Sequence, residues 1–137
     1  MPLPNEKNPS GRALVGVVGP CSAGKTTLIA GLQQHGIAAR HIAQEHSFVP
    51  HMWQRLADPK VLIYLDVSYP VSMQRRLLDL NSQEFAEQQE RLRNAREHAD
   101  LYLVTDSLTP EEVLEQVLRF IKQVDKNSIQ ELDSGEF

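Results

Sequence analysis

Apolar residues occur along this chain in two patterns, as short continuous runs and as stripes at helical spacing. The runs predict strands, and they cover residues 13–18, 38–43, 61–66 and 100–106. The stripes predict helices, one ending at Gly36 and others over residues 52–56, 71–80, 83–99 and 109–124. Strands that alternate with helices favour a parallel sheet with helices on both faces. We therefore expect an α/β fold, a three-layer domain around a small, mostly parallel four-stranded sheet.

The link between the first strand and the first helix has the spacing G-x-x-x-x-G-K-[ST], which is typical of phosphate-binding loops between a strand and a helix. Its residues are Gly19, Pro20, Cys21, Ser22, Ala23, Gly24, Lys25, Thr26 and Thr27. The glycines let the chain curl until successive N–H groups point at a polyphosphate. Lys25 would reach the β- and γ-phosphates, and Thr26 would bind Mg²⁺. The stretch resembles the Walker A loop of P-loop nucleoside triphosphatases and kinases, and it predicts a nucleoside triphosphate site.

Two acidic residues are candidates for the position next to the Mg²⁺ ion. Asp66 ends the strongly apolar run at 61–66, and ligands collect at the carboxyl ends of parallel strands. Glu45 follows the weaker run at 38–43 and would lie at the same edge of the sheet. The sequence leaves both acids open as metal partners, and it leaves Glu45 open as a catalytic base.

The segment after the third predicted strand resembles a known family. Leu65-Asp66-Val67-Ser68, followed by Pro70 and the pair Arg75-Arg76, is similar to the strand and lid helix of thymidylate kinases and related nucleoside monophosphate kinases. The later segments Val104-Thr105-Asp106 and Leu108-Thr109-Pro110 resemble the closing strand and helix of that superfamily. The resemblance implies transfer of the ATP γ-phosphoryl group, with Lys25 and Mg²⁺ below it and Arg75 and Arg76 closing over it as catalytic residues.

The chain departs from these kinases where they hold their acceptor. They have an additional strand and a longer insertion, whereas only residues 44–60 separate the second and third predicted strands here. One interpretation is a kinase with a reduced acceptor region and an unknown small-molecule or nucleotide acceptor. The other is a regulatory nucleotide-binding domain with slow hydrolysis and no acceptor. Because no Asn-Lys-x-Asp run for guanine recognition is present, ATP is the expected nucleotide.

Composition and charge limit the classes of partner that we expect for this chain. The chain has 137 residues, a formal net charge of -4 and one cysteine. We expect one domain at residues 13–124, with a flexible leader at 1–12 and a polar tail at 125–137. The acidic balance argues against nucleic acid as a partner. The lack of a leader peptide or a long apolar span argues against a membrane and for a cytoplasmic protein. The sequence leaves the acceptor and the oligomeric state open.

Overall fold

The computed structural model describes residues 14–57, 59–75 and 81–135. The predicted leader at residues 1–12 and Arg76 lie outside these residues. No helix in the described part of the chain has both the length and the apolar character that crossing a bilayer requires.

Four parallel strands form one sheet in the order β2-β1-β3-β4. Their bounds are β1 Val15–Val18, β2 Ala39–His41, β3 Val61–Asp66 and β4 Leu101–Val104. The four strands lie within the predicted apolar runs, so the α/β class and the four-stranded parallel sheet are confirmed. Because all strands run the same way, the loops that follow β1, β2, β3 and β4 meet at one edge of the sheet.

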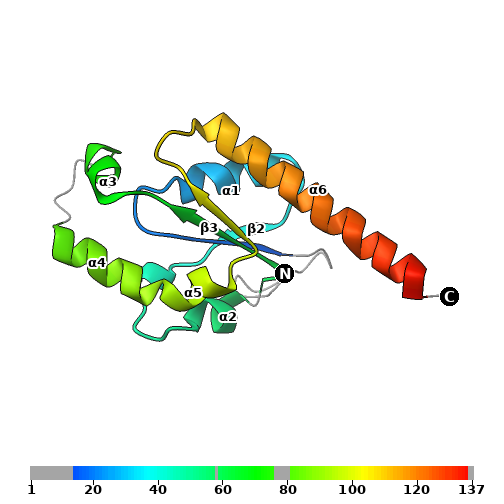
Figure 1. Ribbon diagram of the computed structural model, residues 1–137, viewed down its shortest axis with the longest axis horizontal. Coiled ribbons are helices and arrows are strands. Elements are labelled where there is room, and N and C mark those ends of the chain that lie inside the picture. The colour runs from blue at the N-terminus through cyan, green and yellow to red at the C-terminus, as the bar shows by residue number, and fades with distance from the viewer. Residues whose placement is uncertain (1–13, 58, 76–80, 136–137) are drawn as a thin grey trace, which may run out of the picture.

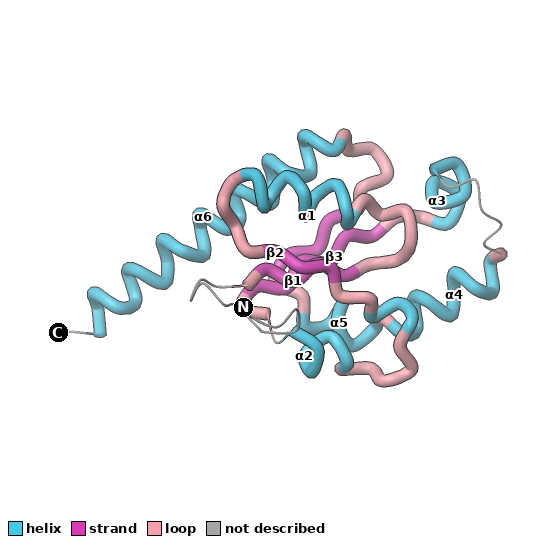
Figure 2. Tube along the Cα trace, turned by 180° about the vertical axis from the view of Figure 1, so that it is seen from behind, coloured by secondary structure: helices cyan, strands magenta, loops and turns pink. Residues whose placement is uncertain are grey.

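Helices lie on both faces of this sheet (Figure 1). The described residues form the helices α1 Lys25–Gln34, α2 Met52–Ala57, α3 Tyr69–Arg75, α4 Ser82–Arg91, α5 Arg93–His98 and α6 Pro110–Gly135, and the short 3₁₀ turn η1 Gln44–His46. Figure 2 shows α1 and α6 together on one face and α2, α4 and α5 on the other. Beyond the end of the sheet lies α3 (Figure 1).

The core has two parts because the central strand β3 is buried on both faces, as its continuous apolar run predicts. Ile63 and Leu65 join the cluster under α1 and α6, whereas Leu62 and Tyr64 join the cluster under α2 and α5. All four side chains are at most 2% exposed. Successive side chains of a strand point to opposite faces, so one strand supports both helical layers.

Two helices differ from the prediction. The expected helix at 83–99 is divided at Leu92 into α4 and α5, and Leu92 and Ala95 are fully buried. In this structure Leu92 and Ala95 therefore pack the α5 part of the segment against the sheet. The last helix, α6, continues past Val124 to Gly135, into the segment predicted as a polar tail. No glycine or proline interrupts residues 125–134, so no breaker ends the helix earlier.

Gly19 lets β1 approach β3 more closely than any side chain permits. A Cβ at this position would stand 2.0 Å from the Leu65 carbonyl oxygen, and the residue has φ +152. We expect Gly19→Ala to lower the free energy of unfolding by more than about 4 kcal/mol, because the clash is with backbone. Urea unfolding followed by circular dichroism measures this loss.

The matched control is Gly24→Ala, at a position with φ +99 where a Cβ meets nothing within 4 Å. Backbone strain alone costs about 1–3 kcal/mol. Equal losses in the two variants would show that the close approach of Gly19 to Leu65 contributes nothing beyond strain.

Candidate functional site

The loop after β1 curls back over the start of α1. Ser22 has φ 72 and Gly24 has φ 99, both in the left-handed region that brings successive N–H groups to one side. Gly24 is the N-cap residue of α1, and Lys25 is its first helical residue. The first turn of a helix leaves its N–H groups without intrahelical partners, so those of Lys25, Thr26 and Thr27 are available to an anion.

Lys25 is buried at the base of this loop. Its Nζ donates to the carbonyl oxygen of Gly19 and to Glu45 Oε2, the latter at 2.6 Å. Lys25 is 7% exposed and Glu45 is 2% exposed, so the pair is shielded from water and interacts strongly. The pair joins the loop after β1 to η1, the turn that follows β2.

The Glu45 carboxylate is surrounded by cationic or potentially cationic groups. His41 Nε2 lies 3.6 Å and His46 Nε2 lies 3.8 Å from its Oε2. Burial alone raises the pKa of Glu45, but the hydrogen bond with His41 and the attraction and hydrogen bond of Lys25 outweigh burial and lower it to about 2. Glu45 is therefore ionised at neutral pH, as a metal partner or general base must be.

Asp66, the other predicted metal partner, lies at the carboxyl end of β3. Its carboxylate accepts hydrogen bonds from the backbone N–H of Val67, from Gln89 Nε2 of α4 and from the Tyr102 hydroxyl of β4. These partners belong to the β3–α4–β4 side of the edge. Of the two acids, Glu45 is the one that contacts the Lys25 ammonium.

Arg75, at the end of α3, bridges two loops at the same edge. Its guanidinium donates to the Ser22 carbonyl oxygen at 3.1 Å and to Thr105 Oγ1 at 2.9 Å, and also to the Thr105 carbonyl oxygen. Thr105 Oγ1 in turn donates to the Ala23 carbonyl oxygen at 2.9 Å. Arg75 and Thr105 thus connect the loop after β1 to the loop after β4.

A pocket of about 350 Å³ opens beside this bridge. Its lining residues come from the loop after β1, from α1, from the end of α3, from the loop after β4 and from the start of α6: Ser22, Ala23, Gly24, Thr27, Leu28, Arg75, Thr105, Leu108, Pro110 and Val113. Most of this surface is apolar, and its polar side chains are those of Ser22, Thr27, Arg75 and Thr105. Such a lining suits a flat, partly polar ligand held next to the loop.

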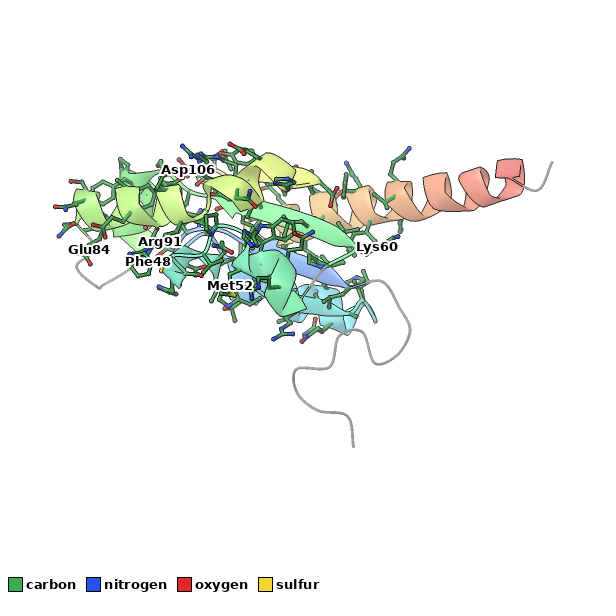
Figure 3. The ribbon with its side chains drawn as sticks, turned by 90° about the horizontal axis from the view of Figure 1, so that it is seen from below. Phe48, Met52, Lys60, Glu84, Arg91 and Asp106 are labelled. Atoms are coloured by element: carbon green, nitrogen blue, oxygen red, sulfur yellow. The ribbon has the colours of Figure 1, made fainter. Side chains whose placement is uncertain are left out.

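Helix α4 covers the other side of the loop. Gln88 is buried, its Oε1 accepts from the Cys21 backbone N–H at 3.2 Å, and its Nε2 lies 3.4 Å from Cys21 Sγ. Arg91 donates to the Glu45 carbonyl oxygen and stacks on Phe48, with its guanidinium carbon 4.4 Å from the ring centre. Figure 3 shows Arg91 and Phe48 together on one side of the molecule.

Sequence reasoning missed Thr105 and Gln88 as parts of this site. Thr105 had a usable signal, because it follows β4 directly and the residues after parallel strands gather at one edge. Gln88 had none, since it is one of several glutamines on a helix whose position depends on the fold. Arg76, predicted to act with Arg75, lies outside the described residues.

Comparison with known proteins adds no family to this geometry. No protein-family model matches the chain, and no curated protein matches it.

The Lys25–Glu45 pair is expected to matter for folding as well as for binding. Lys25→Met leaves a buried carboxylate without its cation, so the free energy of unfolding should fall by about 3 kcal/mol. Glu45→Gln leaves a buried ammonium and should also destabilise. The double variant removes both charges and should be more stable than the sum of the single losses implies, with a coupling energy of at least about 1 kcal/mol. Urea unfolding of the four proteins measures the coupling, and additive losses contradict the pair.

Proposed function

We propose that this chain is a P-loop protein that binds Mg-ATP and transfers its γ-phosphoryl group to a small-molecule or nucleotide acceptor. In this proposal its fold is a three-layer P-loop fold, related to small nucleoside monophosphate kinases with a reduced acceptor region, and the protein is cytoplasmic. The observation that carries the proposal is the loop Gly19–Thr27, with left-handed φ angles at Ser22 and Gly24 and Lys25 at the first turn of α1. That combination of curled backbone, helix start and ammonium fits a polyphosphate.

An unpartnered hydroxyl in the loop supports the same ligand. Ser22 Oγ is buried and has no hydrogen-bond partner among the residues that the structure describes. A buried hydroxyl without a partner costs free energy, and a phosphate oxygen would satisfy it. The pocket beside Ser22 and Arg75 has room for a base and ribose, so phosphates and nucleoside would occupy adjoining sites.

The donor set at the edge of the sheet fits Mg²⁺, which prefers oxygen ligands and keeps several waters. Thr26 Oγ1 would bind it directly, and Glu45 or Asp66 would hold it through water. When bound, the ion would neutralise charge on the β- and γ-phosphates. Thr26 is exposed at the start of α1 and Glu45 is ionised next to Lys25, so both ligand types are in usable form.

Lys25 and Arg75 are the two cationic side chains that would act on the phosphates. The Lys25 ammonium would give up its hydrogen bond to Glu45 and donate to a phosphate oxygen instead, since it can bind either anion at the base of the loop. Arg75 would hold the loop after β1 against the loop after β4 and line the pocket. It would also add positive charge near the γ-phosphoryl group. Glu45, once released by Lys25, would be free to accept a proton from an acceptor hydroxyl.

A regulatory nucleotide-binding domain without an acceptor is the second candidate. The observation that favours it is the contact of Gln88 with Cys21, because the Gln88 side-chain oxygen already accepts a hydrogen bond from a backbone N–H of the phosphate loop. The short segment between β2 and β3 also leaves little chain for an acceptor site. In that case nucleotide binding would move α4, and hydrolysis would be slow.

Binding of Mg-ATP by calorimetry tests the common part of both candidates. Lys25→Met should weaken Mg-ATP at least about tenfold, the loss expected for a charged hydrogen bond. The matched control is Lys60→Met, which removes the same charge at the amino end of β3, on the side of the molecule away from Arg91 and Phe48 (Figure 3). Unfolding curves verify that both variants fold. Absence of binding by the unaltered chain, or equal affinity in both variants, contradicts the site.

Labelled ATP, offered with a panel of small hydroxyl compounds and nucleosides and with a no-acceptor control, separates the two candidates. A kinase passes the label to one acceptor, and Arg75→Ala should then lower kcat by at least about tenfold while changing the Kd of ATP less. Arg119→Ala serves as the control, because Arg119 is an exposed residue of α6 paired with Glu115. Slow hydrolysis with no labelled acceptor supports the regulatory domain.

A further inference from the structure

Three metal-ligating groups of different chemistry meet at the mouth of the phosphate loop. Cys21 Sγ, the Glu45 carboxylate and a His46 ring nitrogen all lie within 4.8 Å of one another. Cys21 belongs to the loop after β1, while Glu45 and His46 belong to η1 after β2. Paired parallel strands deliver these two segments to the same edge of the sheet.

One atom of this group lacks the partner that its burial requires. Glu45 Oε1 has no hydrogen-bond donor in the described part of the chain, although Glu45 is only 2% exposed. Lys25 holds the other oxygen, Oε2, at 2.6 Å. A buried carboxylate oxygen left without a donor is costly, and a cation bound to Oε1 removes that cost without displacing Lys25.

We propose that Cys21, Glu45 and His46 bind a Zn²⁺ ion, separate from the Mg²⁺ ion proposed for the nucleotide and sharing only Glu45 with the candidate ligands of that ion. Thiolate, imidazole and carboxylate are the ligands that Zn²⁺ takes in proteins, whereas Mg²⁺ avoids sulfur. Ligand atoms of a tetrahedral zinc site stand roughly 3.3–3.8 Å apart. One ligand atom of each of the three residues already lies within 4.8 Å of the others, so small side-chain movements complete three ligands, and water takes the fourth position.

The charges at the site permit this ion. Zn²⁺ and Lys25 bring three positive charges, and the Cys21 thiolate and Glu45 bring two negative ones. Binding therefore releases the thiol proton and leaves one net positive charge beside the phosphate loop. Gln88 Nε2, 3.4 Å from Cys21 Sγ, supplies a hydrogen bond that orients the sulfur, as groups around metal ligands commonly do.

The zinc site ties the phosphate loop to the segment that follows β2, and it exists whether or not the chain binds ATP. Titration of the metal-free full-length protein with Zn²⁺ against a chromophoric chelator is expected to give one ion per chain. Cys21→Ser and His46→Ala should each weaken Zn²⁺ more than about tenfold. The matched control is His35→Ala, at the far end of α1, which should keep the affinity of the unaltered chain.

Co²⁺ provides a second measurement that reports the ligand directly. The unaltered chain and His35→Ala should give a sulfur-to-cobalt charge-transfer band, and Cys21→Ser should lose it. Circular dichroism verifies folding, and His46→Ala, at an exposed side chain, keeps the test decisive if Cys21→Ser does not fold. The proposal is overturned if the folded chain binds no Zn²⁺, or if Cys21→Ser, or His46→Ala in its place, binds it as tightly as the control.

Discussion

The arrangement of this site depends on the buried ion pair of Lys25 and Glu45. The two residues come from different strand ends, and each is less than a tenth exposed, so neither charge can be left alone without a large desolvation cost. Their contact at 2.6 Å fixes the loop after β1 against the turn after β2. Other side chains contact the same two segments. Gln88 and Arg91 pack α4 over the two segments that the ion pair joins, and Arg75 contacts the loop after β1 from the opposite side.

The all-parallel sheet explains why so many polar groups converge here. Every strand ends at the same edge, so β1 leads into the loop before α1, β2 is followed by Glu45, β3 ends in Asp66 and β4 is followed by Thr105. The apolar side chains of the central strands β1 and β3 pack into the two core clusters. Polar groups therefore gather at the carboxyl ends of the strands and in the loops and helix ends that follow them.

The sequence was most informative where structure is decided locally. The apolar runs predicted all four strands, and the motif predicted the loop with Gly24 at the start of α1, because turn geometry and periodicity are properties of short segments. Choices that depend on side-chain direction could not be made this way. Glu45 contacts Lys25 while Asp66 turns toward Gln89 and Tyr102, and both residues simply follow an apolar run in the sequence.

Features that depend on contacts between distant parts of the chain were even harder to predict from short sequence patterns. The bend at Leu92 contains no glycine or proline, and it arises where Leu92 and Ala95 turn into the core under α5. The contact between Gln88 and Cys21 joins residues 67 positions apart, so no local pattern encodes it. Gln88 is likewise buried as a polar residue, and its partner is Cys21 in the loop after β1.

The ion pair also constrains how any phosphate can enter the loop. An ammonium that moves from Glu45 to a phosphate oxygen leaves a buried carboxylate with one fewer cation, and such a charge is costly unless another cation replaces the lost one. His41 and His46 are within 4 Å of Glu45 Oε2, and both proposed ions, Mg²⁺ and Zn²⁺, would lie close to the same acid. Anion binding at the loop and cation binding at Glu45 would therefore favour each other. By linkage this coupling acts equally in both directions, so the surroundings of Glu45 would help set the affinity for phosphate as directly as the loop itself does.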